Sequence, residues 1–213
     1  MPETSGDPRE DAEEPEIKPA DLGHVVHDLL SRVDFSRDVP AQLPDLTSTL
    51  DDERLKAETR RLLERFAESR WCEALRASDR ILKETPFELL VGGRVLAGRM
   101  DVMFHDADGW TVLDYKTGRA EDRERYQLQV GIYAHAAHRL IGEMPVRAAL
   151  ILLSAGEEWV QDTSDGAAAR AASETIEGVI TAVDAGRFGP NPGRHCDWCS
   201  VAGCCTKELS SAK

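Results

Sequence analysis

Residues 98–119 read GRMDVMFHDADGWTVLDYKTGR, and this stretch decides the fold. It contains two runs rich in aliphatic and aromatic residues on either side of the turn-forming residues 106–109, a pattern typical of a β-hairpin. A third run of the same kind precedes a pair of glycines just upstream. The sequence therefore predicts three antiparallel strands in a meander, over residues 86–91, 94–104 and 110–116.

The rest of the chain shows helical periodicity around one further strand. The continuous apolar run 146–154 suits a strand that is buried on both faces. Residues 37–50 are broken by Pro40 and Pro44, so no element is expected there. The expected helices cover residues 20–35, 121–141 and 166–186, with one or two more within 51–84 that are interrupted near Ser69. This order predicts an α/β fold in which a central mixed sheet is flanked by helices, with an N-terminal helical segment and a C-terminal Cys-rich tail.

Length and composition bound the domain organisation and the class of protein. The 213 residues suffice for one compact domain, which we expect over residues 20–188, between a disordered acidic tail (1–19) and a Cys-rich segment (189–213).

The formal net charge of -13 disfavours tight, independent binding to nucleic acid, because proteins that bind it alone are usually basic. The chain contains no GxxxxGKS/T phosphate loop, so it is not itself an ATP-driven motor.

The sequence also bears on location. No apolar run approaches the roughly 18 residues that cross a bilayer. The first residues are acidic and Pro-rich, which is the opposite of a secretory signal. We therefore expect a cytoplasmic protein without membrane contact.

Three charged residues on the predicted hairpin could form a catalytic centre. Asp114 and Lys116 project from the same face of a strand because side chains alternate, and the hairpin would bring Asp101 near Asp114. Two neighbouring carboxylates repel each other unless a cation lies between them, and oxygen ligands favour Mg²⁺ or Mn²⁺. The lysine would stabilise negative charge on a phosphodiester. The alternative is that Asp101 faces solvent and that Asp114 and Lys116 form an exposed ion pair.

The order of the motifs around these residues resembles a known family. Gly98-Arg99-Met100-Asp101, then Val112-Leu113-Asp114-Tyr115-Lys116-Thr117, then Gln129-x-x-x-Tyr133 are similar to the PD-(D/E)XK nuclease domain shared by RecB, AddA, AddB and Cas4 proteins. The resemblance extends roughly over residues 20–205 and includes the helix with Gly23-His24-Val25-Val26-His27 and the segment Lys83-Glu84-Thr85-Pro86-Phe87 that leads into the first strand.

The resemblance assigns roles to individual residues. It implies that His27, Asp101 and Asp114 hold a metal ion together with the backbone carbonyl of Tyr115, and that Lys116 positions and polarises the attacking water. It further implies that Gln129 and Tyr133, one helical turn apart, contact DNA or orient Lys116. Simpler alternatives stay open for two residues, since Tyr133 could be a core aromatic and His27 a core histidine.

A second group of candidate ligands lies in the Cys-rich tail. Cys196, Cys199 and Cys205 have the spacing C-x2-C-x5-C, similar to the triplet that binds an iron–sulfur cluster in AddB- and Cas4-like members. Those members add an upstream cysteine, for which Cys72 is the candidate in this chain. A 4Fe–4S cluster is thus the first expectation. The alternatives are a zinc site made by tail cysteines, including Cys204, with His195 nearby, or no metal at all.

The expected function follows from these motifs. The resemblance implies a Mg²⁺-dependent DNA nuclease, with an exonuclease mode expected, that forms part of a RecB-like helicase–nuclease in DNA recombination and repair. Its implied partners are single-stranded DNA and a RecB/UvrD-like motor. A zinc deaminase, which also ends in CxxC, is excluded because no H-x-E motif precedes the cysteines. The alternative is a catalytically inactive nuclease fold that binds DNA or a partner protein.

Overall fold

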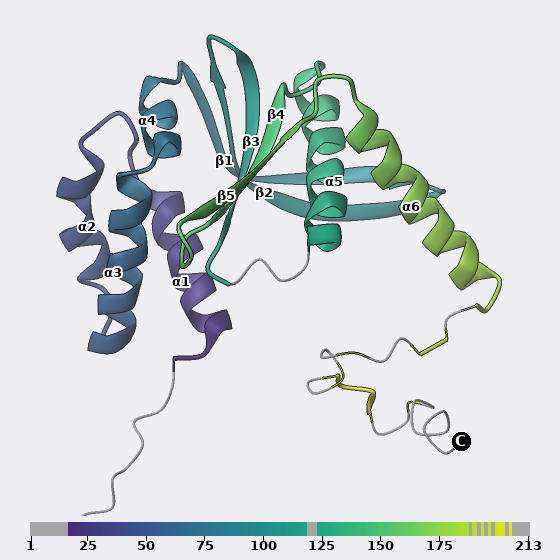
Figure 1. Ribbon diagram of the computed structural model, residues 1–213, viewed down its shortest axis with the longest axis horizontal. Coiled ribbons are helices and arrows are strands. Elements are labelled where there is room, and N and C mark those ends of the chain that lie inside the picture. The colour runs from purple at the N-terminus through teal and green to yellow at the C-terminus, as the bar shows by residue number, and fades with distance from the viewer. Residues whose placement is uncertain are drawn as a thin grey trace, which may run out of the picture.

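A five-stranded mixed sheet separates two layers of helices (Figure 1). The structure is a computed structural model that describes residues 17–118, 123–187, 189–190, 193, 196, 199–202 and 205. The strand order is β1-β2-β3-β4-β5, and β3 and β4 are parallel whereas the other neighbours are antiparallel. This arrangement confirms the predicted α/β fold. The strands are β1 (Arg80–Val91), β2 (Arg94–Asp106), β3 (Gly109–Lys116), β4 (Arg147–Leu152) and β5 (Glu157–Asp162).

The first helical layer covers one face of the sheet. Its core is formed by the apolar stripes of the helices, including Leu29 and Phe66, which pack against the sheet residues Val102 and Phe104. The predicted interruption at Ser69 is confirmed, because the Ser69 side chain caps the last of these helices by accepting a hydrogen bond from the backbone N–H of Cys72. The layer consists of α1 (Pro19–Arg32), α2 (Val39–Thr47), α3 (Glu53–Ala67) and α4 (Arg70–Ala77).

The second layer consists of α5 (Arg123–Ile141) and α6 (Ala167–Asp184) on the opposite face (Figure 1). The α5 helix connects β3 to its parallel neighbour β4, as a parallel pair of strands requires. A separate core that includes Met103, Val130 and Leu150 joins this layer to the sheet. In the described ranges, no helix combines the length and the apolar character needed to cross a membrane.

The helix expected within 51–84 ends earlier than predicted. The α4 helix stops at Ala77, and residues 80–84 belong to β1. The prediction was wrong there because adjacent apolar residues, Ile81 and Leu82, fit a helical stripe as well as a strand. In the structure Ile81 packs against the first core and Leu82 against the second, which is the alternation of a strand between two layers.

Two further elements were not predicted. The α2 helix includes both Pro40 and Pro44; Pro40 lies in the first turn, where its missing N–H costs nothing, and Asp38 caps the helix start. Burial of Leu43 against the first core offsets the break that Pro44 introduces. The side chains of the edge strand β5 are mostly exposed, and its sequence lacks the apolar run by which the other strands were identified.

Close packing of the second layer depends on Gly131. A Cβ atom at this position would lie 2.4 Å from the carbonyl oxygen of Ala168 and 2.7 Å from the Cβ of Ala172 on α6. We therefore expect Gly131→Ala to force the two helices apart and to lower the free energy of unfolding by about 1–3 kcal/mol, measured by urea denaturation. Gly178→Ala is the matched control, because nothing lies within 4 Å of its Cβ position and alanine favours a helix. Equal stability of the two variants would contradict this account.

Candidate active site

At Asp101 the alternation of the β2 side chains between the two faces of the sheet is interrupted. Met100 packs against the second core, whereas Val102, two positions further on the strand, packs against the first core. A regular strand would place both on the same face, so the alternation is interrupted at the residue between them. The Asp101 side chain, 12% exposed, therefore lies in neither core. It lines a cleft of about 410 Å³ between the sheet and α1.

Asp114 lies beside Asp101 near the carboxyl end of β3. The antiparallel register pairs Val102 with Leu113, and one step further it places Asp101 opposite Asp114. The side chain of Asp101 takes the place of a backbone acceptor between β2 and β3, because its Oδ2 accepts a hydrogen bond of 2.9 Å from the backbone N–H of Tyr115. The expected proximity of the two carboxylates is thus present in the structure.

The carboxylate of Asp114 is almost completely buried, with its side chain only 3% exposed. Gln129 Nε2 on α5 donates a hydrogen bond of 2.9 Å to Oδ1, and Lys116 Nζ lies 2.5 Å from Oδ2. The Lys116 ammonium is thus the cation that faces Oδ2 in the structure. The alternative of an exposed Asp114–Lys116 pair is therefore wrong.

Burial and charge perturb this carboxyl group strongly. Desolvation raises the pKa of Asp114 from its usual 3.8 to about 6, and repulsion by Asp101 adds to the shift, while Lys116 and His27 oppose it. A buried carboxylate with a raised pKa, next to a second carboxylate, is a favourable position for a cation. The donor set thus fits a divalent metal ion.

His27 reaches the same cleft from α1. Its Nδ1 lies 3.3 Å from Asp101 Oδ1, and its ring packs edge-on against Tyr115 with centroids 6.0 Å apart. Burial alone would lower the pKa of His27, but the hydrogen bond with Asp101 and the charges of Asp101 and Asp114 outweigh that effect and raise it. With a side chain 29% exposed and facing a carboxylate, His27 is not a core histidine.

Glu84 also lies in this cleft, although no role was predicted for it from the sequence. His27, Glu84 and Asp101 are the one group of at least three His, Cys, Asp or Glu residues in the described ranges whose ligand atoms all lie within 4.8 Å of one another. Asp114 is outside that group. A signal was present in the sequence: the tight turn pairs Val91 with Arg94, and counting back along this register places Glu84 opposite Asp101.

Gln129 and Tyr133 form the wall of the site on α5. Gln129 Nε2 donates both to Asp114 Oδ1 and to the Tyr133 hydroxyl, at 2.9 and 2.8 Å. The Tyr133 ring packs edge-on against Phe87 of β1, with centroids 6.0 Å apart. Burial raises the pKa of Tyr133, so its hydroxyl stays protonated. Tyr133 thus combines core packing with a hydrogen bond to the residue that holds Asp114.

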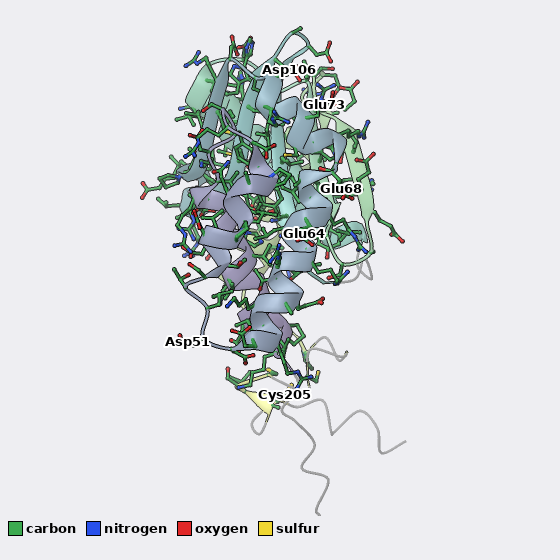
Figure 2. The ribbon with its side chains drawn as sticks, turned by 90° about the vertical axis from the view of Figure 1, so that its left-hand side faces the viewer. Asp51, Glu64, Glu68, Glu73, Asp106 and Cys205 are labelled. Atoms are coloured by element: carbon green, nitrogen blue, oxygen red, sulfur yellow. The ribbon has the colours of Figure 1, made fainter. Side chains whose placement is uncertain are left out.

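The structure does not bring the predicted cluster cysteines together. Cys72 is 1% exposed in the first core, where burial raises the pKa of its thiol to about 11. Figure 2 shows its neighbour Glu73 near one end of the molecule and Cys205 at the other. Cys196 and Cys199 lie one turn apart, and the Cys196 Sγ accepts a backbone N–H from Gly193. The three described tail cysteines do not form a ligand group within 4.8 Å, and Cys204 and His195 lie outside the described residues.

The chain is similar to known proteins in sequence. A sequence model described as the PD-(D/E)XK nuclease superfamily matches residues 4–206. An ATP-dependent helicase/nuclease subunit from Thermoanaerobacter sp. (strain X514) is 24% identical over 152 residues, which are 58% of this chain and 12% of that protein. The corresponding protein from Heliobacterium modesticaldum is 31% identical over 118 residues, 44% of this chain and 8% of that protein. The chain therefore spans a small fraction of the length of these relatives.

A comparison of structures gives a weaker match. The crystal structure of SSO0001 superimposes with a TM-score of 0.43 and 17% sequence identity, over 87% of this chain and 93% of that one. A similarity of that size does not bear on function.

Proposed function

Because the chain belongs to the PD-(D/E)XK nuclease superfamily, we propose that it is a Mg²⁺-dependent deoxyribonuclease that hydrolyses phosphodiester bonds in DNA. One observation supports this most strongly. Asp101 and Asp114, with His27 on one side and Lys116 on the other, converge at the same point of the sheet, and the buried Asp114 carboxylate has the Lys116 ammonium 2.5 Å from its Oδ2. Burial of a carboxylate is costly, and a role in holding a catalytic cation supports an active enzyme over an inactive relative of the superfamily.

Each side chain has a distinct role in the proposed mechanism. Asp101, Asp114, His27 and the carbonyl of Tyr115 would hold the metal ion, which when bound supplies Lewis acidity toward the phosphate and lowers the pKa of water. The Lys116 ammonium would orient the attacking water and stabilise the negative charge that develops on the phosphoryl oxygens.

The residues of α5 act on this centre indirectly. Gln129 would fix the orientation of Asp114 through the hydrogen bond to Oδ1. Tyr133 would hold Gln129 in that position, because its hydroxyl accepts the second N–H of the same amide. The attacking water would release its proton to solvent, and the departing oxygen of the cleaved ester would gain one from solvent. Neither step requires a further residue of this chain.

The test is cleavage of end-labelled DNA by the purified chain. We expect cleavage with Mg²⁺ or Mn²⁺ and none with EDTA, and we expect linear single-stranded DNA to be shortened from its ends while closed circular DNA resists, as for an exonuclease. Cuts in circular DNA would replace the exonuclease mode with an endonuclease mode. The absence of any cleavage with either metal, in a folded protein that binds DNA, would identify an inactive binding module instead.

We also propose that the chain works with a separate or fused RecB/UvrD-like helicase in DNA recombination and repair. The named relatives are subunits of ATP-dependent helicase/nucleases, and the matched segment is a small part of each. The net charge of -13 provides no general attraction to DNA. A motor that holds the strand next to the nuclease would supply a high effective concentration in its place.

This proposal predicts weak binding by the isolated chain. With Lys116→Met to prevent cleavage, we expect a dissociation constant for a single-stranded oligonucleotide in the micromolar range or weaker at physiological salt, with a shallow dependence on salt concentration. Fluorescence anisotropy over a salt titration measures both quantities. Submicromolar affinity would show that the chain binds its substrate without help.

For the tail, we propose that Cys196, Cys199 and Cys205 hold a metal centre, with an iron–sulfur cluster as the first candidate and zinc as the second. Metal and sulfide analysis of anaerobically purified protein distinguishes the two, since only the cluster absorbs visible light. We expect Cys196→Ala to lose the metal. Cys72→Ala should keep it, because Cys72 lies in the first core, and loss in that variant would make Cys72 the fourth ligand. Metal-free, folded wild-type protein would contradict both candidates.

A further inference from the structure

The cleft contains a cation that the proposed mechanism does not use, the guanidinium group of Arg99 on β2. We infer that Arg99 binds a phosphate that flanks the cleaved one, and that this contact positions the DNA strand in the cleft. The inference rests on the proposed function, because it adds a substrate contact to the same site. Arg99 is therefore a substrate-binding residue rather than part of the reacting centre.

The backbone of β2 directs the Arg99 side chain into the cleft. Its two neighbours along the strand face the second helical layer: Met100 lies in the second core, and a Cβ atom at Gly98 would lie 2.5 Å from the Phe87 ring. Because side chains alternate along a strand, Arg99 faces the opposite side, toward α1. There it lines the cleft together with Asp101.

The charges of the cleft favour a phosphate as the partner of Arg99. Among the described residues that line it, Arg99 alone carries a permanent positive charge, whereas three are acidic: Asp28, Glu84 and Asp101. The nearby ammonium of Lys116 already faces Asp114, with Nζ 2.5 Å from Oδ2. The net charge of -13 gives the chain no general attraction to DNA, so a phosphate close to these carboxylates needs a local cation.

The ion pair that holds Arg99 can be exchanged at little cost. Its Nε lies 2.8 Å from Glu84 Oε2, and the Arg99 side chain is 66% exposed. An exposed pair of this kind contributes little stability. A guanidinium group presents its N–H donors in one plane and can bind a phosphate through two of them at once. A phosphate that enters the cleft can therefore take Arg99 from Glu84.

The position of Arg99 separates its phosphate from the one that is cleaved. Lys116 is the residue that acts on the cleaved phosphate in the proposed mechanism, and it lies beside Asp114. Arg99 pairs with Glu84 instead, and no ion pair within the described part of the chain joins it to Asp101 or Asp114. Loss of Arg99 should therefore weaken binding of the strand, which raises KM, more than it slows the chemical step.

A double-mutant cycle between the protein and the DNA tests the contact. Single-stranded oligonucleotides carry one neutral methylphosphonate at each position in turn around the first cleaved bond, and initial rates with Mg²⁺ give kcat and KM. We expect Arg99→Gln to lower kcat/KM on unmodified DNA about 10- to 100-fold, mainly through KM, because a charge-assisted contact is lost. One flanking methylphosphonate should lower the wild-type kcat/KM by a similar factor and leave that of Arg99→Gln unchanged.

The matched control is Arg94→Gln, because Arg94 is an exposed arginine on the same strand that pairs with Asp184 on α6. It should keep the wild-type kcat/KM and the full effect of the methylphosphonate. A second measurement does not need cleavage. In the Lys116→Met background, Arg99→Gln should reduce the slope of log K against log salt concentration for single-stranded DNA by about 0.7, the share of one phosphate contact, whereas Arg94→Gln should not change it.

Each outcome decides the question. A wild-type kcat/KM in Arg99→Gln, or a flanking methylphosphonate effect that persists in full in this variant, would overturn the inference. If Arg99→Gln fails to fold, as judged by circular dichroism, Arg99→Lys replaces it and should lose part of the methylphosphonate effect, because it keeps the charge without the planar fork. Cleavage whose kcat/KM and salt slope do not depend on Arg99 refutes the inference alone. An Arg99-dependent salt slope in a chain that does not cleave refutes the nuclease function alone.

Discussion

Asp114→Asn and Lys116→Met are each expected to lower the rate of Mg²⁺-dependent DNA cleavage on the order of 10³-fold or more. Asparagine keeps the hydrogen bond from Gln129 to Oδ1 but removes the negative charge that would hold the metal ion. Methionine fills the space of the Lys116 stem but removes the ammonium group that lies 2.5 Å from Asp114. Initial rates on labelled single-stranded DNA at saturating Mg²⁺ measure both effects.

The controls for these variants lie on the first helical layer, away from the cleft. Asp45→Asn and Lys56→Met make the same chemical changes on α2 and α3 and should cleave at the wild-type rate. Far-UV circular dichroism and urea denaturation establish that each variant is folded. Cleavage by Asp114→Asn or Lys116→Met within threefold of the control rates would remove these residues from the catalytic centre.

The main features of the fold were predictable because local patterns and topology agree. The meander of β1, β2 and β3 follows from three apolar runs and two tight turns. The burial of β4 on both faces follows from its continuous apolar sequence, as expected for a strand between two helical layers. The α5 helix could be predicted because parallel strands need a long connection, and β3 and β4 have one.

The hairpin register also made part of the candidate site predictable. Strand alternation puts Asp114 and Lys116 on one face, and the turn at residues 106–109 fixes Asp101 opposite Asp114. The burial of Asp114 was not predictable. It depends on α5, whose Gln129 lies beside the carboxylate only after the crossover has folded onto the sheet.

Glu84 was missed for a related reason. A regular alternation along β1 would not separate Glu84 from other exposed acids such as Glu88, and a positive φ at a glutamate is not foreseeable from propensity. Tertiary packing overrides that propensity, because Ile81 and Phe87 are drawn into different cores and the chain must turn between them.

Protonation of Asp114 should be visible in the stability of the metal-free protein. Burial raises its pKa in the folded state from 3.8 to about 6, so folding is favoured when the group is neutral. Below pH 4 the carboxyl is protonated in both states and costs nothing. As the pH rises from 4 through 6, the unfolded state releases this proton first, and the wild type loses stability by an amount on the order of 3 kcal/mol.

Asp114→Asn has no such group and therefore gives the measurement. With EDTA present, the free energies of unfolding of the two proteins should be similar near pH 4, and the variant should become the more stable one by about 1–3 kcal/mol at pH 7. Mg²⁺ should reverse the order at pH 7, because a bound cation stabilises the ionised carboxylate and the variant cannot use it. Urea denaturation at pH 4, 5, 6 and 7, with and without Mg²⁺, measures the difference. If the difference in free energy of unfolding between the two proteins stayed constant from pH 4 to 7, Asp114 would be ionised in the folded protein at no cost. Mg²⁺ would then gain nothing by neutralising a buried charge at this position.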